Sequence, residues 1–169
     1  RLKKTTRHPE SDKILTKTMI NNYAKNDLLP PPVRKKYSKD HLILLIFIFY
    51  LKNILSINDI QTMLEPLKGR FCKSDDELNL SKIYQVADQL SKEELEPCME
   101  DIRKKYEKAL TTFEDEGLSA DERKRMTIFS FISLLSYDVY VKKLLIEKIL
   151  DNMTEADGKR DGSKDKKKK

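Results

Sequence analysis

The sequence predicts an all-α protein, and three features of its composition and patterning support this fold class. Of its 169 residues only four are glycine and six are proline. Long runs of alternating apolar and polar residues, which half-buried strands show, do not occur. Apolar residues instead recur at helical spacing behind residues that favour helix N-caps. The length suits one domain with a substantial core or two small domains.

Most of the basic charge lies in the first quarter of the chain. Residues 1–39 contain 11 Lys and Arg against 3 Asp and Glu, whereas residues 40–153 contain 16 against 21 and residues 154–169 contain 7 against 4. Such localisation is typical of a surface that meets phosphate groups, although solvated basic faces are common in lysine-rich proteins. We expect residues 1–14 to form a basic arm or the remnant of a first helix.

A short amphipathic helix is predicted over residues 17–25, with Thr16 as its N-cap. Met19, Ile20 and Tyr23 fall at helical spacing and can face a core. Amide side chains can pair with base edges and lysines with phosphates, so the opposite face is a candidate for groove contact. An ordinary surface helix with a polar face would show the same pattern. The candidate DNA-binding residues on this face are Lys17, Thr18, Asn21, Asn22 and Lys25.

A stiff basic connection, which we call the wing (residues 30–37), follows this helix. Residues 26–27 can adopt the left-handed conformation that ends a helix, and two leucines then return the chain to the core. Three prolines enforce an extended segment. A cation that is already held in place loses less entropy on meeting a phosphate, which favours DNA contact over a solvated connector. The candidate residues here are Arg34, Lys35, Lys36 and Tyr37.

Two further capped helices are predicted after the wing. Ser38 caps a helix over residues 39–53, whose LILLIFIFYL segment is apolar on almost every face and must be surrounded by other elements. Ser56 caps the next helix, over residues 57–64, which ends before Pro66.

The order TMINNYAKNDLL, prolines, basic residues and KYSKDHLILLIFIFYLKNILSINDIQTML resembles the DNA-binding domain of the MerR family of bacterial transcription regulators. Lys36-Tyr37-Ser38 match the family's entry into its apolar helix, and residues 54–60 match the helix after it. The resemblance implies a winged helix-turn-helix over residues 15–67. Asn21 and Asn22 depart from it, since they stand where an arginine and a tyrosine are frequent. The whole chain also resembles a bacterial family described only as a domain of unknown function that carries such a unit.

A helical C-terminal region is predicted over residues 68–153. We expect a loop at 68–79, a helix at 80–90, a helix at 92–114 that Ser91 caps, and a long last helix at 120–153 that Ser119 caps. Pro97 must lie in the first turn of a helix or at a break between two helices. The last helix is apolar on more than one face, which suits either a partner subunit or a buried helix in a monomer. Residues 154–169 are expected to form a disordered basic tail.

Catalytic and metal-binding patterns do not occur in the sequence. It contains no glycine-rich phosphate loop and no Cys/His or Ser/His constellation, and Cys72 and Cys98 match no zinc spacing. The longest apolar runs, 42–51 and 126–137, are too short to span a bilayer, and the first residues lack the apolar region of a secretory signal. We therefore expect a cytoplasmic protein that is not an enzyme, with no cofactor, no metal and no membrane contact.

The leading hypothesis is a MerR-like transcription regulator that binds double-stranded DNA as a homodimer through its C-terminal helices. The helix at 17–25 would enter the major groove, and the cations at 34–36 would contact the backbone. The alternative is a helical protein–protein interaction module without sequence-specific DNA binding. A weaker idea is a small-molecule effector pocket in the C-terminal region, although the aromatic residues that could line it suit a core better: Phe129, Phe131, Tyr137 and Tyr140.

Overall fold

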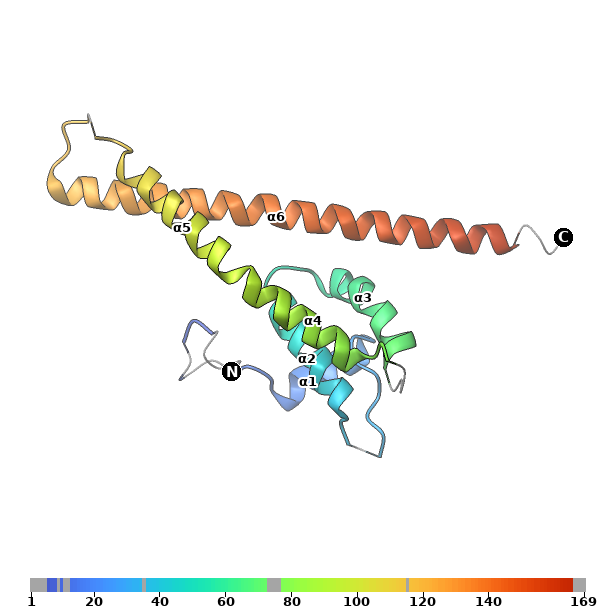
Figure 1. Ribbon diagram of the computed structural model, residues 1–169. Coiled ribbons are helices and arrows are strands. Elements are labelled where there is room, and N and C mark those ends of the chain that lie inside the picture. Colours follow the sequence, from blue (N-terminus) through green and yellow to red (C-terminus); the bar gives the residue numbers. More distant parts are fainter. Residues whose placement is uncertain are drawn as a thin grey trace. The chain divides into compact units, whose positions relative to one another are not determined.

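The computed structural model describes residues 6–8, 10, 13–34, 36–72, 77–114 and 116–165, without the side chains of Arg70 and of residues 155–165. The regular structure of this part is helical (Figure 1). Its only strand-like pairing is a single antiparallel bridge between Val33 and Lys36. The predicted all-α class is confirmed. The chain divides into two compact units, Arg1–Tyr84 with Ile149–Lys169 and Gln85–Lys148.

Three short helices of the first unit begin where the sequence predicts. They are α1 (Lys17–Lys25), α2 (Lys39–Leu51) and α3 (Ile57–Pro66). Each follows a residue whose side-chain hydroxyl accepts a backbone N–H of the first turn, which satisfies a donor that the helix leaves unpaired: Thr16, Ser38 and Ser56. The helix α1 also ends where predicted, whereas α2 ends two residues earlier and α3 two residues later than predicted, because terminal turns fray and are weakly specified by sequence.

The core of the first unit forms around α2. Leu28 and Leu29, just after α1, are almost wholly buried and pack with the inner residues of α2. Full burial of one leucine contributes about 1.5–3 kcal/mol, so these two leucines fix the position of the chain between α1 and the wing. The cluster consists of Leu28, Leu29, Ile43, Leu44, Leu45, Ile48, Leu55, Ile60, Leu64, Leu80 and Leu150.

A π-helical turn, η2 (Leu67–Phe71), continues α3 where the sequence predicts a loop from Lys68 onward. Pro66 lacks a backbone N–H and cannot complete the i to i−4 ladder. The chain widens into a π-type turn after it, as often happens where a helical ladder is interrupted. Coil therefore begins later than predicted.

The helices α4 (Leu80–Glu93) and α5 (Leu95–Leu110) meet at a break that lies after the predicted one. Ser91 is inside α4, and its hydroxyl donates to the Asp88 carbonyl at 2.9 Å instead of capping a new helix. The break is at Glu94, which leaves Pro97 in the first turn of α5, where a missing N–H removes no hydrogen bond. The expected cap at Ser91 is wrong because Pro97 sets the position of the break.

Within the second unit, α5 packs against α6 (Ala120–Asp165). Ala109 on α5 and Thr127 on α6 are both buried. Three side-chain pairs join the helices: the rings of Tyr106 and Phe131, with centroids 5.2 Å apart, Lys105 Nζ and Asp138 Oδ2 at 3.7 Å, and the Thr112 and Ser130 hydroxyls at 2.9 Å. The two ends of the α5–α6 turn are thereby held together.

The helix α6 begins after Ser119, as predicted. The Glu122 carboxylate accepts hydrogen bonds from the Ser119 N–H at 2.9 Å and hydroxyl at 2.6 Å, and these bonds hold the pKa of Glu122 below its usual value. The helix continues through Asp165, past the predicted end at Met153, into residues expected to be disordered; residues 154–165 contain no proline that would stop it. No helix in the described part combines the length and hydrophobicity that a bilayer span requires.

The aromatic residues of α6 do not form a common core. Phe131 packs against Tyr106, but Phe129, Tyr137 and Tyr140 each expose more than half of their surface. The expectation that all four suit a core is therefore wrong for three of them. These three aromatic side chains contribute to an exposed apolar surface on α6.

Candidate nucleic-acid interface

The outer side of α1 carries the five residues that the sequence singles out. Residues three and four apart on a helix are neighbours, so this set forms one continuous face. The face includes two lysines, two carboxamides and a hydroxyl, and all five side chains are exposed: Lys17, Thr18, Asn21, Asn22 and Lys25. The structure therefore brings these predicted residues together on one surface.

The inner side of α1 holds this face in place. Ile20 and Tyr23 pack against the core cluster, and burial raises the pKa of the Tyr23 phenol. The Leu28 N–H donates to the Tyr23 carbonyl at 2.9 Å, which ties the helix end to a buried leucine. A nine-residue helix is only marginally stable by itself. The rigidity of the polar face thus comes from these tertiary contacts.

A side chain of η2 also holds the chain just after α1. Asp27 adopts the left-handed conformation, with φ at 53°, as the sequence predicts for residues 26–27. Lys68 Nζ donates to the Asp27 carbonyl oxygen and pairs with Glu65 at 2.6 Å, and the Lys68 side chain is only 11% exposed. A nearly buried, charged donor fixes the turn that leads from α1 into the wing.

The start of the wing is attached to α2 through His41, which is 3% exposed. The Ser38 N–H donates to His41 Nδ1 at 3.1 Å, so Nδ1 acts as the acceptor and the proton resides on Nε2. His41 Nε2 then donates to the Pro30 carbonyl oxygen at 3.1 Å. One buried ring therefore completes the cap that Ser38 forms on α2 and fixes the first proline of the wing.

The tip of the wing is a tight turn closed by the Lys36 N–H, which donates to the Val33 carbonyl at 2.9 Å. Arg34 occupies the left-handed region, with φ at 50°, which is unfavourable for a residue with a side chain. Arg34, Lys36 and Tyr37 are exposed, and the Tyr37 ring meets the His41 ring edge-on at 5.4 Å. Lys35, the remaining predicted wing residue, lies outside the described residues.

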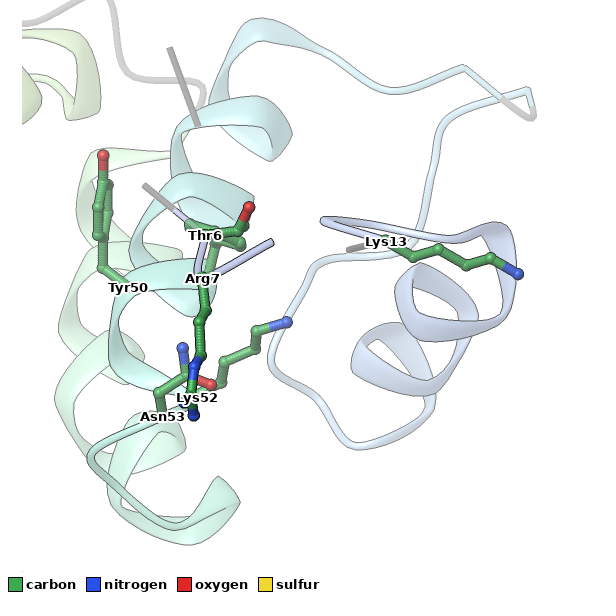
Figure 2. Close-up of a pocket in the computed structure, with 7 residues that line it drawn as sticks. Thr6, Arg7, Lys13, Tyr50, Lys52 and Asn53 are labelled. Atoms are coloured by element: carbon green, nitrogen blue, oxygen red, sulfur yellow. The ribbon is translucent and has the colours of Figure 1, made fainter. Parts of the chain in front are cut away.

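A basic hollow of about 360 Å³ lies at the C-terminal end of α2. Three cations are among the described residues that line it, and none of those residues is acidic (Figure 2). Arg7, Lys52 and Asn53 lie close together in Figure 2, whereas the Lys13 side chain extends away from them on the segment before α1. The Lys52 ammonium also lies over the Phe49 ring, 5.2 Å from its centroid.

Sequence reasoning missed this hollow. The density of cations before residue 39 could have indicated Arg7 and Lys13. Lys52 and Asn53 follow a strongly apolar helix, and no local pattern connects them with residues 40 positions earlier. Among the described residues, no three His, Cys, Asp or Glu side chains gather in a way that could hold a metal ion.

Comparison with known proteins places the chain in a family. Residues 1–87 match the family described as "Domain of unknown function (DUF1836)", so the protein belongs to that family. The match covers α1, the wing, α2, α3 and the beginning of α4. No curated protein and no solved structure matches the chain.

Proposed function

We propose that this protein is a cytoplasmic, non-enzymatic transcription regulator that binds double-stranded DNA through a MerR-like winged helix-turn-helix. The observation that carries the proposal is the pairing of a polar, exposed α1 face with a cationic wing, both attached to one core. Residues 17–37 contain five Lys and Arg and one Asp, and the described candidates among them are exposed. This arrangement supplies both kinds of contact that DNA recognition uses.

The geometry of α1 suits the major groove. An α-helix with its side chains is about 10–12 Å across, which fits the major groove width of about 12 Å, and the nine residues of α1 give about 13 Å of helix that can lie in the groove. In this proposal Asn21 and Asn22 contact base edges, while Lys17 and Lys25 contact phosphates. Arg34 and the rest of the wing contact the flanking backbone, and the basic hollow offers a further site for phosphate.

A homodimer through α6 completes the proposal. On the side of α6 away from α5, four apolar residues each expose more than half of their surface: Phe129, Ile132, Val139 and Tyr140. Together they present on the order of 500 Å² of apolar area. A stable interface buries about 800 Å² per partner, and homodimer interfaces are about 65% apolar. A second copy of this chain therefore fits the patch in size and polarity.

Charge reversal in the wing tests DNA binding. Duplexes selected from a random pool by the wild-type protein would be titrated at about 50 mM salt, with fluorescence anisotropy as the readout. We expect Lys35→Glu/Lys36→Glu to weaken binding by at least about tenfold, because two phosphate contacts become repulsive. The control Lys104→Glu/Lys108→Glu makes the same charge change on exposed positions of α5 and should bind as the wild type does.

Two outcomes would oppose the proposal. If the folded wild-type protein selects no duplex, or if both double variants bind equally, DNA recognition by the wing is wrong. Capture of a protein partner by the Lys35→Glu/Lys36→Glu variant, without any DNA binding by the wild type, would favour the alternative of an interaction module. For the dimer, Phe129→Glu should shift the sedimentation mass from dimer to monomer, whereas Lys148→Glu should not.

A further inference from the structure

A second hollow, of about 460 Å³, lies in the second unit where α5 turns into α6. Its volume falls within the range of small-molecule sites, about 300–1,000 Å³. The proposed DNA contacts use none of its residues. The lining consists of Tyr106, Leu110, Ala120, Arg123, Lys124, Thr127 and Ile128.

The walls of this hollow are mainly apolar. Leu110 and Ile128 each leave almost half of their surface exposed, and Ala120 is small enough to leave space at the start of α6. The Tyr106 ring is fixed by its edge-to-face contact with Phe131. A fixed aromatic wall opposite aliphatic side chains suits the hydrocarbon part of a ligand.

Arg123 shapes the edge of the hollow. Its Nη1 donates to the Glu114 carbonyl at 2.9 Å and to the Phe113 carbonyl at 3.5 Å. Phe113 has φ at 61°, a conformation that an aromatic residue adopts only under external constraint. Arg123 therefore holds the chain between α5 and α6 in place at Phe113 and Glu114, and its charge is directed toward backbone carbonyls.

Thr127 supplies a polar group. It exposes 8% of its surface and lines the hollow. Its hydroxyl is not a buried orphan, because no buried side-chain oxygen or nitrogen among the described residues lacks a hydrogen-bond partner. A hydroxyl on the wall of an otherwise apolar hollow is the group to which a polar ligand atom can hydrogen-bond.

Lys124 provides the charge. It lies three residues before Thr127 and four before Ile128, so the three side chains are neighbours on α6. No acidic residue is among the described residues that line the hollow. The nearest acids on α6 are Asp121 and Glu122, and the carboxylate of Glu122 is already bound to Ser119.

We propose that this hollow binds a small amphipathic anion, a carboxylate with an aliphatic body of medium length. The aliphatic chain lies between Tyr106, Leu110 and Ile128, and the carboxylate accepts a hydrogen bond from the Thr127 hydroxyl and pairs with Lys124. None of these residues is among the proposed DNA contacts, and all of them belong to the second unit.

The proposal is tested on the full chain by calorimetric titration with decanoate, and with decan-1-ol as the uncharged analogue. Lys124→Gln should weaken decanoate binding by about tenfold, which is the loss of one charge-assisted contact. Thr127→Val keeps the shape but loses the hydroxyl and should weaken binding about fivefold, whereas Thr127→Ser should retain it. Lys148→Gln, which removes a lysine from α6 outside the hollow, should bind decanoate as the wild type does.

Three results would overturn the proposal: no saturable binding of decanoate, equal affinity for decanoate and decan-1-ol, or equal affinity of Lys124→Gln and Lys148→Gln. The second and third would show unspecific association with the exposed apolar surface of α6. Circular dichroism on each variant confirms that the helices remain intact. These results are separable from the proposed function, since DNA binding by the wild-type protein is measured without decanoate.

Discussion

His41→Phe tests the central support of the wing. The phenylalanine ring fills most of the space of the buried imidazole but can neither accept from the Ser38 N–H nor donate to the Pro30 carbonyl. Each lost hydrogen bond is worth about 1 kcal/mol, and each buried group left unpaired costs about 1–3 kcal/mol. The ring swap recovers some apolar burial, so we expect a net loss of about 2–4 kcal/mol in the free energy of unfolding.

The assay is urea unfolding followed by circular dichroism, with His8→Phe as the control. That control makes the same substitution at the other histidine of the chain, which is exposed, and should change stability by less than about 0.5 kcal/mol. DNA affinity of folded His41→Phe should also fall, because Pro30 is no longer attached to α2. A midpoint for His41→Phe equal to that of the wild type would refute the assigned hydrogen bonds.

Three other changes give distinct outcomes. Arg34→Gly removes the backbone strain of a residue with a side chain in the left-handed region, so it should raise the free energy of unfolding by about 0.5–1 kcal/mol while weakening DNA binding. A lower stability in urea unfolding would show that the turn is not strained. Leu44→Ala removes a fully buried side chain and should cost about 2–5 kcal/mol, and a loss below about 1 kcal/mol would contradict the position of α2 in the core. Glu122→Gln removes a carboxylate whose pKa is lowered by its hydrogen bonds from Ser119. The loss of melting temperature in this variant should therefore be present above about pH 4.3 and vanish as the pH falls through the lowered pKa of Glu122. A loss that persists in acid would contradict the stabilising contact between Ser119 and the Glu122 carboxylate.

The local features of the first unit could be predicted from the sequence because short-range rules determine them. Thr16, Ser38 and Ser56 each stand directly before a helix and accept the backbone N–H three residues further on. The helical period of 3.6 residues places the polar side chains of α1 opposite its apolar ones. The left-handed conformation of Asp27 follows from the turn preference of its residue type. These features fix which residues share the α1 face.

Contacts between distant residues could not be predicted in this way. Lys68 reads as part of a polar loop, yet its ammonium is nearly buried against the Asp27 carbonyl, 41 positions away. His41 looks like an isolated histidine until α2 and the wing come together around it. The hollow beside Lys52 and the hollow lined by Thr127 likewise depend on packing. Such sites arise when residues far apart in the chain pack together, and no periodic pattern in a single sequence shows which residues will meet.

The salt dependence of DNA binding tests the main proposal most directly. Affinity for a selected duplex would be measured between about 50 and 200 mM salt for the wild type and for Lys17→Gln/Lys25→Gln, with Lys104→Gln/Lys108→Gln as the matched control. Counterion release predicts a steep decrease in the wild type and the control, and a slope shallower by about two in the α1 variant. Equal slopes for all three proteins would show that the exposed face of α1 does not meet DNA.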